Sequence, residues 1–188
     1  MHIVLEGLPG SGKTTMSSLL SEQDGYTKID EILVPIPDDS DEFAYIDHDI
    51  AKVAQRDESK KTVMDRSYFS TLGYNYANDL CTGSVNFYRV KQRIDQELAA
   101  ERLKNPDIVI YLQVSINTSL AQQNPSNAAF WRLDAMLKYS EEYVLKYLEE
   151  SYEGIVEYID GSQPITAVYE DIKQIIAKHS LGEATNAA

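Results

Sequence analysis

A glycine-rich loop near the N-terminus constrains the fold of this chain more than any other feature. Residues 7–14 read GLPGSGKT and match the pattern G-x-x-x-x-G-K-[ST] at every fixed position. The apolar run from Ile3 to Leu5 precedes the loop, and the pattern of residues 15–20 after it is typical of a helix. In this strand–loop–helix context the pattern indicates a phosphate-binding loop. We therefore expect an α/β fold in which the strand at residues 3–5 is central and covered on both faces.

The residue types of the loop explain how it would hold a nucleoside triphosphate. Glycines let the main-chain amides of residues 10–14 turn toward phosphate oxygens, and the following helix points its positive end at the same anion. Lys13 would reach the β- and γ-phosphates, and the hydroxyl of Thr14 would hold Mg2+. The predicted nucleotide-binding residues are Gly10, Ser11, Gly12, Lys13, Thr14 and Thr15. A glycine turn without this function would need neither the lysine nor the hydroxyl.

The composition limits the classes of partner. Of the 188 residues, 43% are hydrophobic and 25% are charged, and 30 acids against 17 Lys and Arg give a formal net charge of −13. Such a chain fits one soluble globular domain, and its acidity argues against binding to nucleic acid or to an anionic membrane. No apolar run approaches the roughly 18 residues of a membrane span. The single cysteine, Cys81, cannot form an intramolecular disulfide, which suits a reducing cytoplasm.

Five short apolar segments alternate with segments of helical pattern. We expect strands at residues 3–5, 26–33, 62–65, 107–112 and 155–159. We expect helices at residues 13–22, 42–57, 68–80, 85–104, 115–123, 131–151 and 164–179. This order predicts a three-layer α/β fold, with a five-stranded, mainly parallel sheet that binds its ligands at the carboxyl ends of the strands. A single domain would span residues 1–181, with a lid at about 122–132 and a flexible tail at 182–188.

Absent signatures narrow the class of nucleotide-binding protein. The sequence has no Asn-Lys-x-Asp motif for guanine and no second glycine-rich signature of a transporter ATPase. A small-molecule kinase that uses ATP remains. Asp65 and Arg66 support it, because they end an expected strand beside the phosphate loop, where the carboxylate would order Mg2+ and the guanidinium would clamp the acceptor. The structural alternative is an aspartate that caps the next helix and pairs with Arg66.

Two of these segments together resemble a known family. Residues 6–15 and the segment DRSYFSTLGY at 65–74 are similar to the thymidylate kinase and deoxynucleoside kinase superfamily of P-loop kinases. Thymidylate kinases carry Asp-Arg followed by a serine and an aromatic on this helix, and deoxynucleoside kinases carry Glu-Arg-Ser. In the order of its elements the resemblance extends from Met1 to about His179. It implies transfer of the γ-phosphoryl group of ATP, with Mg2+, to a nucleoside or nucleoside monophosphate.

The resemblance also implies roles for individual residues. Glu31 would be the general base toward the acceptor hydroxyl, and Arg132 in the lid would offset charge on the transferred group. The predicted catalytic residues are Lys13, Glu31, Asp65, Arg66 and Arg132. The predicted acceptor contacts are Glu31, Arg66, Tyr68, Phe69 and Arg93. The alternatives are a solvated loop carboxylate for Glu31, a surface helix start for Arg132 and an ordinary core position for the aromatic residues.

The acceptor itself is left open by the sequence. Six acids lie between Asp38 and Asp49, against Lys52 and Arg56 farther along the segment. A pocket rimmed by acids would repel a monophosphate, which slightly favours a neutral nucleoside or an amine-bearing molecule such as an antibiotic; a solvated acidic face is the alternative. Another possibility is a regulatory module that binds or slowly hydrolyses ATP. The helix at residues 85–104 could pack against a second copy, as in related dimers.

Overall fold

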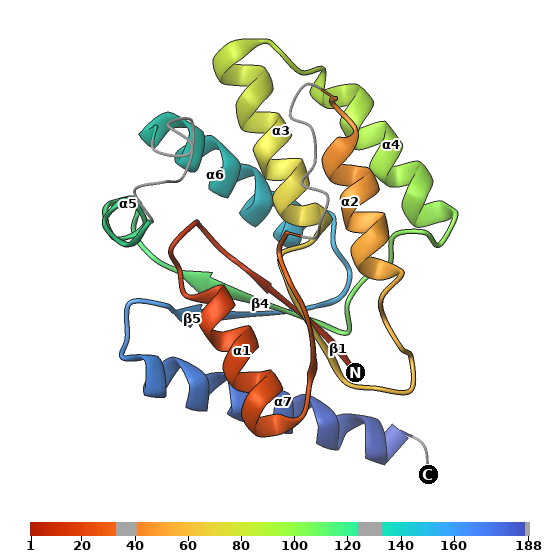
Figure 1. Cartoon of the computed structure of the whole chain (residues 1–188), viewed down its shortest axis with the longest axis vertical. Coiled ribbons are helices and arrows are strands. Elements are labelled where there is room, and N and C mark those ends of the chain that lie inside the picture. The colour runs from red at the N-terminus through yellow and green to blue at the C-terminus, as the bar shows by residue number, and fades with distance from the viewer. Residues whose placement is uncertain (33–40, 124–132, 187–188) are drawn as a thin grey trace.

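A parallel sheet forms the centre of the molecule, and helices cover both of its faces (Figure 1). The computed structural model describes residues 1–32, 41–123 and 133–186. The strands are β1 (His2–Glu6), β2 (Thr27–Ile29), β3 (Thr62–Asp65), β4 (Ile108–Gln113) and β5 (Ile155–Asp160). Their order is β2-β3-β1-β4-β5, and every pairing is parallel. The predicted five-stranded α/β sheet is therefore confirmed, with the strand before the glycine loop at its centre.

The helices divide between the two faces according to their apolar residues. They are α1 (Lys13–Asp24), α2 (Ala44–Val53), α3 (Tyr68–Thr82), α4 (Phe87–Ala99), α5 (Ile116–Gln122), α6 (Asp134–Glu150) and α7 (Ile165–Asn186). Helices α1 and α7 pack on one face, where Leu20 and Ile172 join a core cluster with Ile3 and Ile110 of the sheet. Helices α2, α3, α4 and α6 build the second cluster with the alternate residues of β4. The successive residues of β4 therefore face two different layers, as in a three-layer fold.

Several element ends differ from the expected ones. Strand β2 has three residues instead of eight, because it is an edge strand that pairs only with the four-residue β3. Helix α4 ends at Ala99, since Glu101 has a positive φ of 57° and the chain turns back onto the carbonyl of Glu97. Helix α7 continues to Asn186, through residues where we expected a flexible tail. Within the described residues, no helix is both long and apolar enough to cross a membrane.

Candidate active site

The loop between β1 and α1 surrounds the ammonium group of Lys13. This group donates hydrogen bonds to the carbonyl oxygens of Gly7 at 2.9 Å and Leu8 at 2.8 Å, and to Oγ of Ser11 at 3.2 Å. The Lys13 side chain is only 4% exposed. Burial, and then the positive charge of Arg66, lower the pKa of Lys13 to about 7. All of these partners are oxygens of the loop itself, so the lysine lies where bound phosphate oxygens would meet it.

Close backbone packing fixes the shape of the loop. Gly7 has a φ of 138°, and a Cβ atom there would lie 2.4 Å from the carbonyl oxygen of Leu112 in β4. A side chain is therefore excluded where the loop leaves β1. On the other side, Ser119 of α5 donates a hydrogen bond of 2.6 Å to the carbonyl oxygen of Pro9. Strand β4 and helix α5 thus pack against the loop.

Thr14 and Asp65 form a candidate magnesium site. The Thr14 hydroxyl donates to Oδ2 of Asp65 at 2.5 Å, which links the start of α1 to the end of β3. Asp65 is fully buried, and its Oδ1 has no hydrogen-bond partner among the described residues. Leaving a buried carboxylate oxygen unpaired costs free energy, and hydroxyl and carboxylate oxygens are ligands that Mg2+ prefers. The described residues contain no cluster of three or more metal-ligating side chains, so the ion would also need phosphate oxygens.

Arg66 and Glu31 form an ion pair beside the loop. Nε of Arg66 lies 2.6 Å from Oε1 of Glu31, and Nη1 donates to Oγ of Ser70 at 3.0 Å. Burial opposes the charged form of Glu31, but Arg66 and then Lys13 outweigh it and lower the pKa of that carboxyl. Glu31 is therefore ionised at neutral pH and able to accept a proton. Arg66 itself has a φ of 61°, in the left-handed region that residues other than glycine adopt at a cost in free energy.

Glu6, for which the sequence indicated no role, anchors the turn that carries Asp65 and Arg66. It is 1% exposed, and its Oε1 accepts hydrogen bonds from the Ser67 amide at 2.9 Å and hydroxyl at 3.2 Å. Its Oε2 accepts from the Ser70 hydroxyl at 2.5 Å. Burial raises the pKa of Glu6. These contacts also explain why the Ser67 hydroxyl does not cap α3. The sequence signal that could have indicated this role is an acidic residue at the end of a mostly apolar strand.

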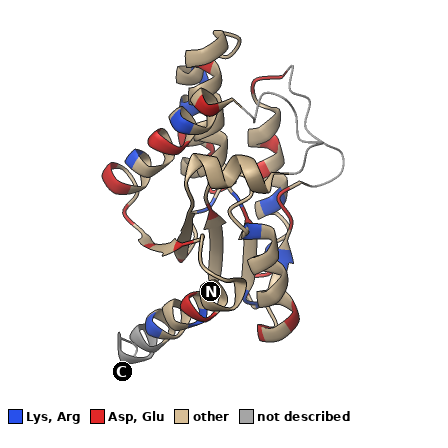
Figure 2. Cartoon of the chain, turned by 90° about the vertical axis from the view of Figure 1, so that its left-hand side faces the viewer, with Lys and Arg blue, Asp and Glu red and all other residues tan. Residues whose placement is uncertain are grey.

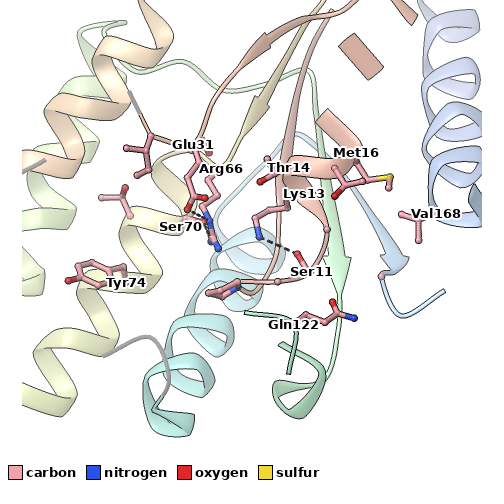
Figure 3. Close-up of a pocket in the computed structure, with 18 of the residues that line it drawn as sticks. Ser11, Lys13, Thr14, Met16, Glu31, Arg66, Ser70, Tyr74, Gln122 and Val168 are labelled. Carbon is pink, nitrogen blue, oxygen red and sulfur yellow. Dashed lines mark hydrogen bonds and ion pairs between the residues drawn. The ribbon is translucent and has the colours of Figure 1, made fainter. Parts of the chain in front are cut away.

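A cavity of about 720 Å³ joins these groups (Figure 3). One half lies along the phosphate loop and is also lined by Gln122, residues 161–163 and Val168. The other half lies between α2 and α3, beyond Glu31 and Arg66, and we call it the acceptor half. Its helical lining residues are Tyr45, His48, Asp49, Lys52, Ser70, Thr71 and Tyr74. The ion pair of Glu31 and Arg66 thus lies between the phosphate loop and a second compartment.

Most of the predicted site residues lie at the cavity, and three of them lie away from it. The predicted residues that line the cavity are Gly10, Ser11, Gly12, Lys13, Thr14, Thr15, Glu31 and Arg66. Tyr68 and Phe69 are buried in the core beside α6, where the Phe69 ring lies 5.1 Å from that of Tyr152, so their assignment to the pocket wall is wrong. Arg93 pairs with Asp47 and Glu97 and does not line the cavity.

The predicted lid lies almost wholly outside the described residues. Arg132 and the rest of residues 124–132 belong to this undescribed part of the chain, so the expected role of Arg132 stays a prediction. Gln122, at the end of α5, is the predicted lid residue that lines the cavity.

The sequence pointed to the segment that contains α2 as a possible acidic rim of the acceptor pocket, but it identified no residue of α2 as part of the site. Lys52 is 1% exposed and donates to the carbonyl oxygens of Asp65 at 2.9 Å and Arg66 at 2.8 Å. Residues 45, 48, 49 and 52 share one face of the helix, since they follow the spacing i, i+3, i+4 and i+7. All four are polar or aromatic, although an ordinary core-facing stripe is apolar. This polar stripe was the signal that could have identified the wall.

Comparisons with known proteins find sequence and fold similarity to nucleoside and nucleotide kinases. No protein-family model matches the chain. A probable thymidylate kinase from Methanobrevibacter smithii is 24% identical and aligns with 95% of each chain. The solved deoxyadenosine kinase from M. mycoides with bound dATP has a TM-score of 0.72 at 20% identity and covers 94% of this chain and 100% of its own. Thymidylate kinase from Candida albicans has a TM-score of 0.74 at 18% identity, with coverages of 95% and 92%. The three-layer fold is therefore shared with solved kinases over nearly the whole chain.

Proposed function

We propose that the chain is a P-loop nucleoside or nucleotide kinase, like the proteins to which it is similar, and that it transfers the γ-phosphoryl group of ATP, with Mg2+, to a hydroxyl of a nucleoside or nucleoside monophosphate. The observation that carries the proposal is the arrangement of the cavity. The phosphate loop with Lys13 lines one half of the cavity, and helices α2 and α3 line the acceptor half. The ionised Glu31, paired with Arg66, lies between the two halves. A phosphoryl group passes between two substrates at such a junction.

The residues divide the work of the reaction by position. The loop amides and Lys13 bind the β- and γ-phosphates of the donor. Mg2+, when bound at Thr14 and Asp65, supplies positive charge to the phosphate oxygens. Glu31 accepts a hydrogen bond from the acceptor hydroxyl and takes its proton as that oxygen bonds to the γ-phosphorus and the bond to the β–γ bridging oxygen breaks. Arg66, 2.6 Å from Glu31, holds the carboxylate and offsets charge on the transferred group. The products are ADP and the phosphorylated acceptor.

A label-transfer experiment tests the proposal. The chain is incubated with ATP labelled at the γ-phosphate and a panel of nucleosides, nucleoside monophosphates and amine-bearing antibiotics. Label is expected on a nucleoside or its monophosphate, and Lys13→Ala should lower turnover by about 100- to 1,000-fold, since it removes one preorganised donor. Label that appears only as free phosphate would instead favour the regulatory module. Full turnover in the Lys13→Ala variant would contradict the role of the loop.

The role of Glu31 has a matched control next to it in the chain. Glu31→Gln keeps the size of the side chain and removes its basicity, so kcat should fall by about 100- to 10,000-fold while substrate binding is retained. Asp30→Asn is the control, because Asp30 pairs with Lys28 at 2.7 Å and does not line the cavity. Its kcat should stay near that of the unmodified chain. A Glu31→Gln variant with unchanged kcat would remove Glu31 as the base.

A further inference from the structure

The acceptor half of the cavity combines two aromatic rings with one buried carboxylate. The rings of Tyr45 on α2 and Tyr74 on α3 lie 5.5 Å apart at 54°. In Figure 3, Tyr74 and Lys13 lie on either side of Arg66, so the tyrosine faces the end of the cavity away from the phosphate loop. Asp49 lies one turn after Tyr45 on α2 and is 5% exposed. Aromatic faces suit a planar group such as a base, and a carboxylate beside them reads its edge.

The cationic side chains near the carboxylate of Asp49 donate their hydrogen bonds to other oxygens. Among the described residues, Lys52 and Arg66 are the cationic side chains that line the acceptor half. Lys52 donates to two main-chain carbonyl oxygens, and Arg66 contacts Glu31 and Ser70. Nζ of Lys52 lies 3.7 Å from Oδ1 of Asp49, which is longer than a hydrogen bond. The lysine therefore offsets the charge of Asp49 without saturating its oxygen.

A hydrogen bond to Oδ2 of Asp49 fixes the orientation of its carboxylate. The Thr71 hydroxyl donates to Oδ2 of Asp49 at 2.6 Å, and a threonine hydroxyl has only one hydrogen to give. This bond leaves Oδ1 as the oxygen with unused acceptor capacity. Burial raises the pKa of Asp49, whereas Lys52 and the Thr71 hydroxyl favour its ionised form. A ligand that donates a hydrogen bond to Oδ1 would complete the pairing of a group that is expensive to bury unpaired.

We propose that Asp49 selects the acceptor by accepting a hydrogen bond from an amino group on its base, so that amino-bearing nucleosides are used in preference to their oxo counterparts. The inference rests on the proposed function and narrows its substrate class. An exocyclic amino group presents N–H donors to Oδ1. An oxo group presents lone pairs instead, which repel the carboxylate and leave it buried without a donor. Sites built to bond a substrate group discriminate strongly against an analogue that lacks it.

Two pairs of nucleosides that differ in one group test the preference. Deoxycytidine and deoxyuridine differ by an amino or an oxo group on the ring, and so do deoxyadenosine and deoxyinosine. For the unmodified chain, kcat/KM should be about 100-fold higher for the amino member of the pair that is used. Equal values, or a preference for the oxo member, would overturn the proposal while leaving the kinase function intact. This measurement needs no variant, so it holds even where a substitution impairs folding.

A variant then assigns the preference to Asp49. Asp49→Asn keeps the shape and an oxygen for the Thr71 hydroxyl, and its amide can donate to an oxo group. The amino-to-oxo ratio of kcat/KM should fall by about 100-fold, to near unity or below. Asp47→Asn is the control, because Asp47 is exposed on the same helix, pairs with Arg93 and does not line the cavity. Its ratio should be unchanged, and an unchanged ratio in Asp49→Asn would overturn the proposal.

Direct binding separates failure of this inference from failure of the proposed function. The binding of deoxycytidine and deoxyuridine to the ADP-bound chain is measured by calorimetry. If no acceptor is phosphorylated but the amino member binds better, and Asp49→Asn removes the difference, the assignment of Asp49 stands and the kinase function fails. If neither member of either pair binds or reacts, the inference about Asp49 fails, and the label-transfer panel, which includes other nucleosides and the monophosphates, decides the kinase function separately.

Discussion

Seven charged side chains lie around the phosphate loop, and their neighbours shift the pKa values of several of them. The cations are Lys13, Lys52 and Arg66, and the carboxylates are Glu6, Glu31, Asp49 and Asp65. Glu31 and Arg66 favour each other's charged forms. Lys13 differs, because burial and the neighbouring Arg66 lower its pKa to about 7. At neutral pH the lysine is therefore near its midpoint, although only the ammonium form attracts phosphate.

Nucleotide affinity should consequently depend on pH above neutrality. Below its pKa of about 7 Lys13 already carries its proton, whereas above it the residue must take one up when phosphate binds. Between about pH 7.5 and 9, where the phosphates are fully ionised, the affinity for Mg-ADP should fall about tenfold per pH unit. Calorimetry in two buffers of different ionisation enthalpy should show uptake of about one proton. Lys13→Met should bind more weakly and without this slope. A flat profile for the unmodified chain would contradict the prediction.

Which residues could be recognised from the sequence depends on how local their signal is. Lys13 and Thr14 belong to a contiguous motif, and Asp65 and Arg66 end a strand whose place in a parallel sheet is predictable. The roles of Tyr68 and Tyr74 depend on where another helix packs. Both lie on α3, but Tyr68 faces the core beside α6 and Tyr74 lines the cavity. Helical spacing places the two tyrosines on different faces of α3, but only the position of α6 decides which face is core and which lines the cavity.

At the scale of elements, α3 is the wall shared by the core and the cavity. One side packs against α6, and the other carries Ser70, Thr71 and Tyr74 toward the acceptor half. The two helices approach closely at Gly73, where a Cβ atom would lie 2.6 Å from Cγ2 of Val144 and 2.7 Å from the carbonyl oxygen of Ser140. The two helices can approach this closely because residue 73 has no side chain.

Gly73→Ala should therefore destabilise the chain, although alanine is the better helix former. Overpacking of a close contact costs about 1–3 kcal/mol, with the upper part of this range expected here because one contact is with a backbone oxygen, and the gain in helix propensity returns about 1 kcal/mol. We expect a net loss of about 1–2 kcal/mol in the free energy of unfolding, measured with urea. Cys81→Ala, at an exposed position of the same helix, is the control and should change it by less than about 0.5 kcal/mol. A Gly73→Ala variant as stable as the unmodified chain would show that the helices can separate without cost.

The order and type of the elements were predictable, and their ends were less so. Apolar runs and turn residues identify the five strands, since each run is too short for a helix. Strand β2 was predicted too long because the run at residues 26–33 has no internal stop. Its pairing ends at Ile29 opposite Met64, one residue before the four-residue β3 itself ends. The length of β2 therefore depends on the neighbouring strand, and the sequence of residues 26–33 alone does not determine it.

At the scale of the whole molecule, the dominant property is negative charge. The formal net charge is −13, and Figure 2 shows Asp and Glu along the helices and loops of the molecule. The cations at the cavity do not form a positive funnel, because Arg66 and Lys52 each lie within 4 Å of a carboxylate. An approaching nucleotide therefore meets a repulsive field at long range and binds through short-range contacts to the loop and Mg2+. Salt screens the long-range part and leaves the short-range part largely intact.

Association of a nucleotide should accordingly speed up with ionic strength. Raising the salt concentration from about 20 to 200 mM shortens the Debye length from about 20 to about 7 Å, so the association rate of Mg-ATP should rise about threefold. Stopped-flow measurement with a fluorescent ATP analogue gives this rate directly. A neutral nucleoside at saturating ATP is the control, and its kcat/KM should change by less than about twofold, because it carries no charge for the field to act on. An association rate that falls with salt would instead reveal a local positive field at the cavity mouth that outweighs the net charge of the chain.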